Sequence, residues 1–364
     1  MHFGLFNLMT QRDKAKTPRE IYAEMADQVR VAEEIGFEIA WFAEHHFSNY
    51  CLCPSPLTMS TYMAARTRRI KLGPAVIVAP LYEPIRMLED IGLLDQLSDG
   101  RAVLGFGTGY QEYEFHKFGV DLKKGREIFL ETMDLVEAYL KGDPVSFDGQ
   151  KVKLPETYFS VRTIQKRPPV YVAGMTTDME TQRRAVERGY VPFVTTGWNT
   201  VNVIRQIKDK LRETYVTAGG EAQRMPFAIQ RYVFVSHDRD DVLKAADGAR
   251  YVRRIAQAMR NKYGELDGAY LKETPAADEP PLEEIAERTL MGDPETVAEK
   301  LCADLTALEP SHMSLFMAIP GIPQQKTLKS MEMFGKEVLP LVEKRLGKLA
   351  DIGVGVPGLR SNAA

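Results

Sequence analysis

The chain has 364 residues, of which 44% are hydrophobic, and its formal net charge is −3. A chain of this size can bury the core of one large α/β domain or of two ordinary ones. The near-neutral charge and the lack of any Lys/Arg run argue against a nucleic-acid-binding protein. The apolar runs are shorter than the roughly 18 residues that span a bilayer, and no charged leader precedes the first strand. We therefore expect a soluble cytoplasmic protein that binds neither nucleic acid nor membrane.

The cysteines are few and form no framework. They are Cys51, Cys53 and Cys302. An odd number in a chain of this length gives no set of disulfides, and the C-x-C pair lacks a second pair of metal ligands. We interpret them as reduced thiols.

Strand-like and helix-like periods alternate along the chain, which is typical of parallel β/α units. The predicted strands are His2–Asn7, Glu38–Ala43, Lys71–Val78, Ala102–Gly107, Pro169–Gly174, Val191–Thr195, Phe227–Val235 and His312–Met317. The predicted helices are Pro18–Ile35, Glu83–Leu97, Gly125–Leu140, Met179–Arg188, Val201–Ala218, Asp241–Arg260, Pro294–Leu308 and Gln324–Arg345. Eight of each predict a closed (β/α)8 TIM barrel in a single domain, residues 1–345. A doubly wound open sheet is the alternative, which the absence of G-x-G-x-x-G after the first strand disfavours.

Three segments depart from this alternation. Residues 144–168 contain Asp148-Gly149 between two alternating runs, which predicts a small hairpin insertion. Residues 261–281, after the seventh strand and its helix, are polar and too long for an ordinary connection, so they form either a disordered link or a mobile lid. Residues 346–364 form a tail without helical period that trails over a neighbouring surface or frays.

A carboxylate and two imidazoles, Glu44, His45 and His46, end the apolar run Ile39–Ala43. Polar groups at the carboxyl end of a barrel strand face the active-site mouth. Side chains of a strand alternate between its faces, so Glu44 and His46 share one side and His45 takes the other. Adjacent histidines are therefore poor ligands for one metal, and we predict no metal site. The competing interpretation is that the imidazoles only bond loop carbonyls.

Two further strands end in glycine. One exit is Gly105 to Tyr110, and the other is Gly174 followed by Met175, Thr176 and Thr177. Glycines let a ligand approach the backbone amides, and a helix N-terminus after such a turn suits a phosphate. Each exit alone is also compatible with a simple tight turn and N-cap. Two exits in one barrel favour a phosphorylated cofactor.

These motifs, in order and spacing, carry a resemblance to a known family. They are Met1–Leu8, Glu44-His45-His46-Phe47, Leu88–Gln96, Gly100-Arg101, Gly105–Phe115 with Phe118-Gly119, and Pro169–Val172. From residue 1 to about 345 the chain resembles the bacterial luciferase-like flavin-dependent monooxygenases. The resemblance implies a TIM barrel and a two-component enzyme, in which a separate flavin reductase supplies reduced FMN. It also implies that reduced FMN and O2 form a C4a-peroxyflavin that oxygenates a small organic substrate, such as an aldehyde or ketone. The Glu-His-His-Phe run looks more like the FMN branch than the branch that uses a deazaflavin coenzyme.

The resemblance also implies roles for single residues. His45 matches the active-site histidine, and its imidazole suits general acid/base work near neutral pH. Glu44 falls at the flavin edge, and Glu114 matches an aspartate near the ring on the substrate side. The matching cofactor contacts fall in three groups. Ala75 and Val76 are joined by a cis peptide bond under the flavin ring. The ribityl phosphate is contacted by Gly107, Thr108, Gly109 and Tyr110, and a second phosphate contact is made by Gly174, Met175, Thr176 and Thr177.

The chain departs from the family at the phosphate. Thr108 stands where luciferase has an arginine, so a hydroxyl replaces a charge-assisted bond, and we expect Arg126 to compensate. Met175 and Thr176 replace an acidic residue and a serine. The resemblance therefore does not imply light emission. Phe6 and Trp198, aromatics near the mouth, are predicted to line an apolar substrate pocket.

A homodimer is the expected assembly. Two helical segments present apolar side chains that form a dimer seam in the family: Leu57, Met59, Met63, Leu88, Ile91 and Leu94. The alternative is ordinary packing of these helices on the barrel. Two other functions stay open on the sequence alone, a non-catalytic flavin-binding subunit and a metal-dependent barrel hydrolase.

Overall fold

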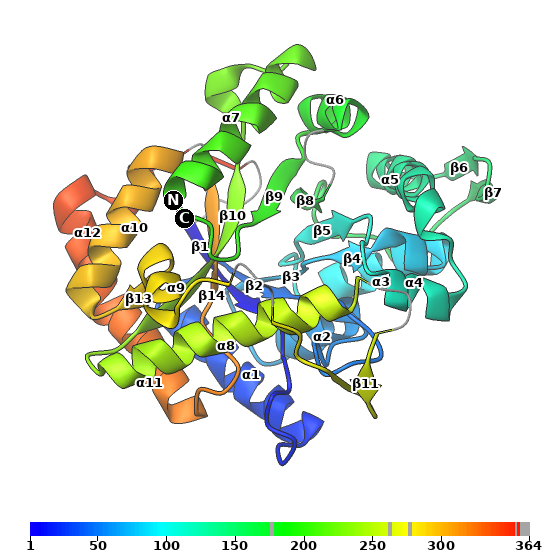
Figure 1. The fold of residues 1–364 in the computed structure, drawn as a ribbon. Helices are drawn as coiled ribbons and strands as arrows, with labels where there is room; N and C mark the ends of the chain where they lie inside the picture. Colours follow the sequence, from blue (N-terminus) through cyan, green and yellow to red (C-terminus); the bar gives the residue numbers. More distant parts are fainter. Residues whose placement is uncertain (175–177, 261–263, 276–278, 354, 357–364) are drawn as a thin grey trace.

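A computed structural model describes residues 1–174, 178–260, 264–275, 279–353 and 355–356. In this part of the chain, nine parallel strands form a nearly closed barrel (Figure 1). In their order around the barrel they are β3 (Lys71–Pro74), β2 (Ile39–Phe42), β1 (His2–Asn7), β14 (His312–Phe316), β10 (Ala228–Val235), β9 (Val191–Thr195), β8 (Val170–Ala173), β5 (Leu104–Gly107) and β4 (Ile77–Val78). The predicted (β/α)8 barrel is confirmed, and the open doubly wound sheet is not formed.

The ring closes where one predicted strand is interrupted. The predicted strand Lys71–Val78 is split into β3 and β4 by a cis peptide bond between Ala75 and Val76. Beyond the split, β4 pairs with β5, while Leu72 on β3 exchanges backbone hydrogen bonds with Arg101 and Val103 just before β5. The interruption therefore places the Ala75–Val76 peptide at the carboxyl end of the barrel, beside the exit of β5.

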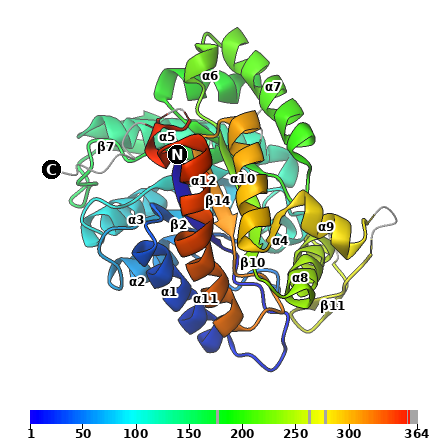
Figure 2. The same cartoon turned by 90° about the vertical axis from the view of Figure 1, so that its left-hand side faces the viewer.

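Helices surround the strands, as predicted (Figures 1 and 2). They are α1 (Pro18–Glu34), α2 (Pro56–Ala64), α3 (Pro84–Leu97), α5 (Gly125–Lys141), α6 (Met179–Arg188), α7 (Val201–Thr217), α8 (Arg239–Ala258), α10 (Pro294–Leu308), α11 (Gln324–Met333) and α12 (Leu339–Leu346). Thr17 begins α1 with a capping box to Glu20, and Asp293 caps α10. In Figure 2, α1 packs beside α11 and α10 beside α12.

Several elements differ from the sequence prediction. The predicted helix Gln324–Arg345 is interrupted by a π turn at Phe334–Val338, two residues before Pro340, which has no N–H to donate. The sequence missed three short elements, α4 (Glu112–Phe118), α9 (Leu282–Arg288) and β13 (Leu290–Gly292). All three are too short to show a clear period.

Aromatic rings fill the barrel below its open end. Trp41 on β2 is fully buried, and its ring contacts those of Tyr171, Phe193 and His312 at centroid distances of 4.9 to 5.7 Å. Since these rings close the interior, a ligand has access only from the carboxyl ends of the strands. No helix of the described residues has both the length and the apolar character needed to cross a membrane.

The insertions follow the predictions in part. The hairpin within residues 144–168 is present as β6 (Val145–Asp148) and β7 (Lys153–Thr157). The described part of residues 261–281 contains a second hairpin, β11 (Leu266–Asp267) and β12 (Tyr270–Leu271). Asn49 fastens it, since its N–H donates to the Ala269 carbonyl at 2.8 Å and its Oδ1 accepts from the Leu271 N–H at 2.9 Å. This hairpin therefore sits on the loop after β2, and a closing motion over the mouth stays a prediction.

The start of the C-terminal tail packs against the body of the protein. The carbonyl of Leu349 accepts a hydrogen bond from the amino group of Met1 at 2.5 Å. Val356, further along the tail, is also buried.

The side chains named for a dimer seam lie in the chain's own interior. Leu57, Met63, Leu88, Ile91 and Leu94 are buried, and Met59 is half-buried. The prediction that these side chains form a seam is wrong, because they pack their helices onto the barrel. The outward faces of the two helices carry Tyr62, Leu93 and Leu97 instead.

Candidate active site

A cavity of about 650 Å³ opens at the carboxyl ends of the strands. The predicted site residues that line it are Phe6, Glu44, His45, Ala75, Val76, Gly107, Thr108, Gly109, Tyr110, Glu114, Gly174 and Trp198. They come from the ends of different strands and from the loops that follow them. The fold thus brings together residues from position 6 to position 198.

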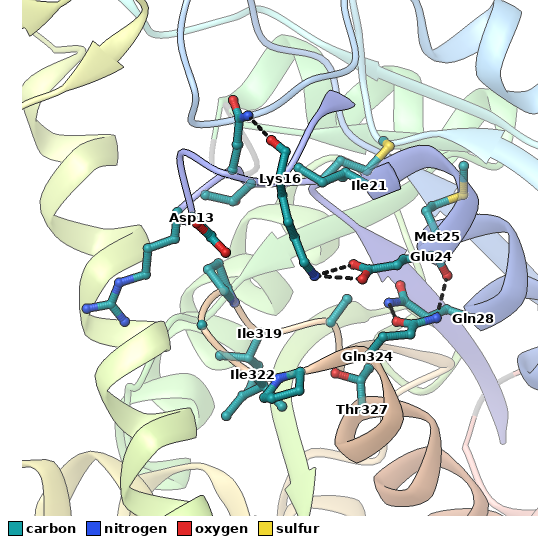
Figure 3. A pocket seen from close by; sticks show the side chains of 18 of the residues that line it. Asp13, Lys16, Ile21, Glu24, Met25, Gln28, Ile319, Ile322, Gln324 and Thr327 are labelled. Carbon is teal, nitrogen blue, oxygen red and sulfur yellow. Dashed lines mark hydrogen bonds and ion pairs between the residues drawn. The ribbon is translucent and has the colours of Figure 1, made fainter. Parts of the chain in front are cut away.

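A second cavity, of about 340 Å³, lies between the segment after β1 and the one after β14 (Figure 3). Two pairs of its polar side chains bind each other. Lys16 Nζ lies 2.6 Å from Glu24 Oε1, and Gln28 Nε2 donates to Gln324 Oε1 at 2.7 Å. None of the predicted site residues lines this cavity, so the mouth of the barrel is the candidate site.

Glu44 and His46 form a buried pair on one side of the β2 exit, as the alternation predicts. Glu44 Oε1 lies 3.0 Å from His46 Nε2, while its Oε2 accepts from the Val78 N–H at 3.1 Å and from the Tyr82 hydroxyl at 2.9 Å. Burial raises the pKa of Glu44, and these hydrogen bonds oppose the rise. The carboxylate therefore links β4 to the exit of β2, and His46, its partner, does not line the cavity.

His45 points to the other side and meets Glu114 of α4. His45 Nδ1 lies 3.0 Å from Glu114 Oε1, and the same oxygen accepts from the His46 N–H at 2.7 Å. Glu114 is 2% exposed, and the His45 side chain is 12% exposed towards the cavity. When Nδ1 donates to the carboxylate, Nε2 is the ring nitrogen left to exchange a proton. Tyr50 and Tyr110 hold the imidazole edge-on at centroid distances of 4.6 and 6.2 Å.

The glycines at the β5 exit let neighbouring side chains pack closely against the backbone. A methyl group at position 107 would come within 2.6 Å of Val76 Cγ2, and one at position 109 within 2.5 Å of the Phe115 ring. Gly109 also has a φ of +70°, which favours glycine. Next to this exit, at the end of β8, Gly174 has a φ of +73°, and a methyl group there would lie 3.4 Å from Thr108 Oγ1. Gly107, Gly109 and Gly174 all line the cavity and present no side chain to a ligand.

Arg126 does not line the cavity. Its guanidinium binds the carboxylate of Asp178 with Nη2 3.0 Å from Oδ1, and Asp178 in turn caps α6. The charge expected to serve a phosphate is therefore paired beside the start of α6. Met175, Thr176 and Thr177, predicted to contact the phosphate, lie outside the described residues.

Sequence reasoning missed one wall of the cavity. Helix α8, the long helix in front of the strands in Figure 1, contributes Val252, Arg253, Ala256, Gln257 and Arg260 from its end and the turn beyond it. The spacing i, i+3, i+4, i+7 of the last four was a readable signal for one helix face. Tyr50, Gln111, Gln230 and Tyr232 also line the site. Their roles depend on tertiary contacts that carry no local signal.

Comparison with known proteins gives the family. The sequence model of the luciferase-like monooxygenases matches residues 1–310. An uncharacterized protein of Sinorhizobium fredii, y4vJ, is 33% identical over 353 residues, which cover 96% of this chain and 99% of that protein. The alkanal monooxygenase alpha chain of the Kryptophanaron alfredi symbiont is 28% identical over 251 residues, covering 69% of this chain and 68% of that one.

A solved structure shows the same fold. The oxygenating constituent of 3,6-diketocamphane monooxygenase from Pseudomonas putida, in complex with FMN, has a TM-score of 0.75 at 19% identity, with 94% of this chain and 98% of that chain covered. Enzymes that use coenzyme F420 share the fold as well. The chain belongs to the luciferase-like monooxygenases and is a flavin-dependent oxidoreductase. This excludes the barrel hydrolase, and the described residues contain no group of three or more His, Cys, Asp or Glu able to hold a metal.

Proposed function

We propose that this protein is the oxygenase of a two-component system, which takes reduced FMN from a separate reductase and uses O2 to oxygenate a small organic substrate such as an aldehyde or ketone. One observation carries the proposal. A single cavity joins a bare glycine wall to a histidine held by a buried carboxylate. The first suits a flat nucleotide, and the second suits proton transfer beside it.

The residues that would hold FMN follow from the shape of the cavity. Ala75 and Val76 would support the ring, since both line the cavity next to Gly107. Gly109 and Gly174 would leave room for the ribityl phosphate, with the Thr108 hydroxyl as a donor. Bound reduced FMN supplies the electrons that activate dioxygen.

The protein itself supplies proton control and exclusion of water. Glu114 accepts from His45 Nδ1, which leaves Nε2 to hold or release a proton in the cavity. Phe6 packs on Phe316 at 5.5 Å, and Phe316 stacks on Tyr232 at 5.0 Å, so one wall is aromatic. Such a wall favours an apolar substrate body and keeps bulk water from the reacting atoms.

The experiment has two parts. FMN and riboflavin are titrated into the purified protein and followed by flavin fluorescence, with coenzyme F420 as a competing nucleotide. Turnover is then measured with a generic flavin reductase under 18O2, using decanal, a cyclic ketone and an aldehyde that also carries a carboxylate. We expect FMN to bind better than riboflavin or F420, and one 18O atom to enter the product. Preference for F420, or oxidation without 18O, contradicts the proposal.

A homodimer is proposed as the assembly. The exposed Tyr62, Leu93 and Leu97 on α2 and α3 provide an apolar outer face. Light scattering of the purified protein measures the mass directly. A mass near twice 41.0 kDa supports the dimer, and a mass near 41.0 kDa contradicts it.

A further inference from the structure

Two arginines line the cavity, Arg253 on α8 and Arg260 in the turn just beyond the end of this helix. Both side chains are exposed. The carbonyl of Ala256, between them, accepts from Gln111 Nε2 at 3.4 Å, which ties the end of α8 to the segment after β5.

These two arginines differ from their neighbours on the same helix. Arg250 binds Asp247 at 2.7 Å, and Arg254 binds Glu279 at 2.7 Å. Among the described residues, Arg253 and Arg260 contact no carboxylate within ion-pair distance. Arg250 and Arg254 are thus paired with carboxylates outside the cavity, whereas the two arginines that line the cavity are not paired within the described residues.

The carboxylates of the cavity are not available to them. Glu44 and Glu114 line the cavity, yet both are buried and bound to histidines. The exposed charges of the described lining are therefore the two guanidiniums. A cleft with exposed charge of one sign attracts ligands of the opposite sign.

The guanidinium of Arg253 is held in place by an aromatic ring. Its guanidinium carbon lies 5.5 Å from the ring centroid of Trp198, which is half-buried in the loop after β9. Stacking on an aromatic face limits the orientations of the guanidinium while leaving its N–H groups free to bind. A planar carboxylate matches the two parallel N–H donors of such a group.

Resting on the proposed function, we propose that the substrate is an organic acid. Its carboxylate binds Arg253, and the charge of Arg260 attracts it to the rim of the cavity. Its apolar body lies along Phe6, Phe316 and Tyr232 and extends towards His45. The other source of a matching anion is the phosphate of FMN. That phosphate is assigned to Thr108 and the β5 exit. The experiment below tests the substrate carboxylate and the FMN phosphate separately.

Binding is measured without turnover by the fluorescence of Trp198, since the other tryptophan, Trp41, is fully buried in the barrel. The probes are decanoate with 1-decanol, and benzoate with benzyl alcohol. We expect each carboxylate to bind at least tenfold more tightly than its alcohol at low salt. Arg253→Met abolishes this preference, Arg253→Lys keeps part of it, and Arg260→Met lowers it about threefold, as expected for a longer-range charge. Equal binding of acid and alcohol overturns the proposal.

The matched control is Arg239→Met, which removes the same charge at the other end of α8, outside the cavity. Arg239→Met should leave the preference for carboxylate over alcohol unchanged. If it lowers this preference as much as Arg253→Met does, the preference depends only on the net charge of the protein, and the proposal is overturned. Melting curves exclude misfolding, because both side chains are exposed. The preference of FMN over riboflavin should be the same in every variant. A tenfold fall in that preference would assign the arginines to the phosphate and overturn the proposal.

The two proposals fail separately. If FMN binds and 18O is incorporated while acids and alcohols bind alike, only the substrate class is wrong. If the carboxylate preference holds while FMN does not bind, the monooxygenase assignment of this cavity is wrong and the anion site stands.

Discussion

The two histidines after β2 have opposite surroundings although they are adjacent. His46 is buried against Glu44, whereas His45 is held by Glu114 and reaches the cavity. The two side chains point to opposite sides of the backbone, so they have different partners. His46 binds the carboxylate that also accepts from the Val78 N–H of β4, whereas His45 lines the cavity.

His45→Ala should lower the oxygenation rate about 100-fold or more, the lower range for removal of a general acid/base, while the Kd for FMN changes less than about threefold. His237→Ala, at an exposed histidine outside the cavity, is the matched control and should keep the wild-type rate. Single-turnover rates and FMN titrations decide this. Wild-type turnover in His45→Ala contradicts the assignment.

Glu114→Gln should keep the position of His45 but weaken the hydrogen bond that holds its ring, because a neutral amide oxygen is a weaker acceptor than a carboxylate. The oxygenation rate should fall about tenfold, which single-turnover measurements decide. A wild-type rate in Glu114→Gln would show that His45 acts without this partner.

His312 is a buried neutral imidazole, and stability should depend on it. Burial lowers the pKa of His312 to about 3, with a smaller contribution from His2. The folded protein then binds fewer protons than the unfolded chain between pH 6.5 and 3, so stability falls as the pH falls. Urea unfolding should show a loss of about 2 kcal/mol from this residue between pH 7 and 5. His312→Leu should flatten that slope, and an unchanged slope would contradict the account.

At the scale of elements, the exit of β5 and the end of α8 form two walls of one cavity. Gly107 and Gly109 keep the first wall bare, whereas α8 supplies the charge of the second. Gln111 joins the two walls through its bond to Ala256. Shape and charge are thus set by different elements.

Gly109→Ala tests the first wall. Its left-handed backbone and the close approach of Phe115 and Val78 both oppose a side chain. Gly119→Ala is the control, because Gly119 has a similar φ of +69° but no atom within 4 Å of the added methyl group. Each change should cost about 1–2 kcal/mol of backbone strain. Only Gly109→Ala should lower FMN affinity, by about tenfold or more, and equal losses in both variants would contradict a role in binding.

Only some of the elements and residues around the cavity could be predicted from the sequence. The strand exits and Glu44, His45 and Gly107 were found because strand, turn and glycine are local signals. The cis peptide bond between Ala75 and Val76 was implied by the resemblance, but Lys71–Val78 was predicted as one unbroken strand. Glu114 as the partner of His45 could not be found by spacing, since the short helix α4 after β5 brings it to the exit of β2.

At the scale of the whole molecule, the barrel is tied to its helical shell by a buried ion pair. Arg231 on β10 binds Asp304 on α10 at 2.8 Å, and both side chains are 3–4% exposed. Burial raises the pKa of Asp304, which Arg231 opposes. The remaining N–H groups of Arg231 bind the carbonyls of Asn199 and Arg288.

Arg231→Met should destabilise the protein by about 3–5 kcal/mol, because Asp304 is left buried without its partner. Adding Asp304→Leu should recover part of that loss, since both charges are then gone. Urea unfolding of the single and double variants measures this coupling. A double variant no more stable than the single one would contradict it.

The closed barrel itself was predictable, because eight repeats of strand and helix admit few other arrangements. The distribution of charge around its mouth was not. In the sequence, nothing distinguishes Arg253 and Arg260 from the other arginines of this polar segment. Only the fold shows that these two line the cavity and that Arg250 and Arg254 bind carboxylates outside it.

The most direct test of the central claim is a crystal structure of the protein with FMN. We predict the ring system over Ala75–Val76, beside His45, with the phosphate at Thr108 and Gly174. FMN bound in the second cavity, between Lys16 and Gln324, or an empty barrel mouth at saturating FMN, would contradict it.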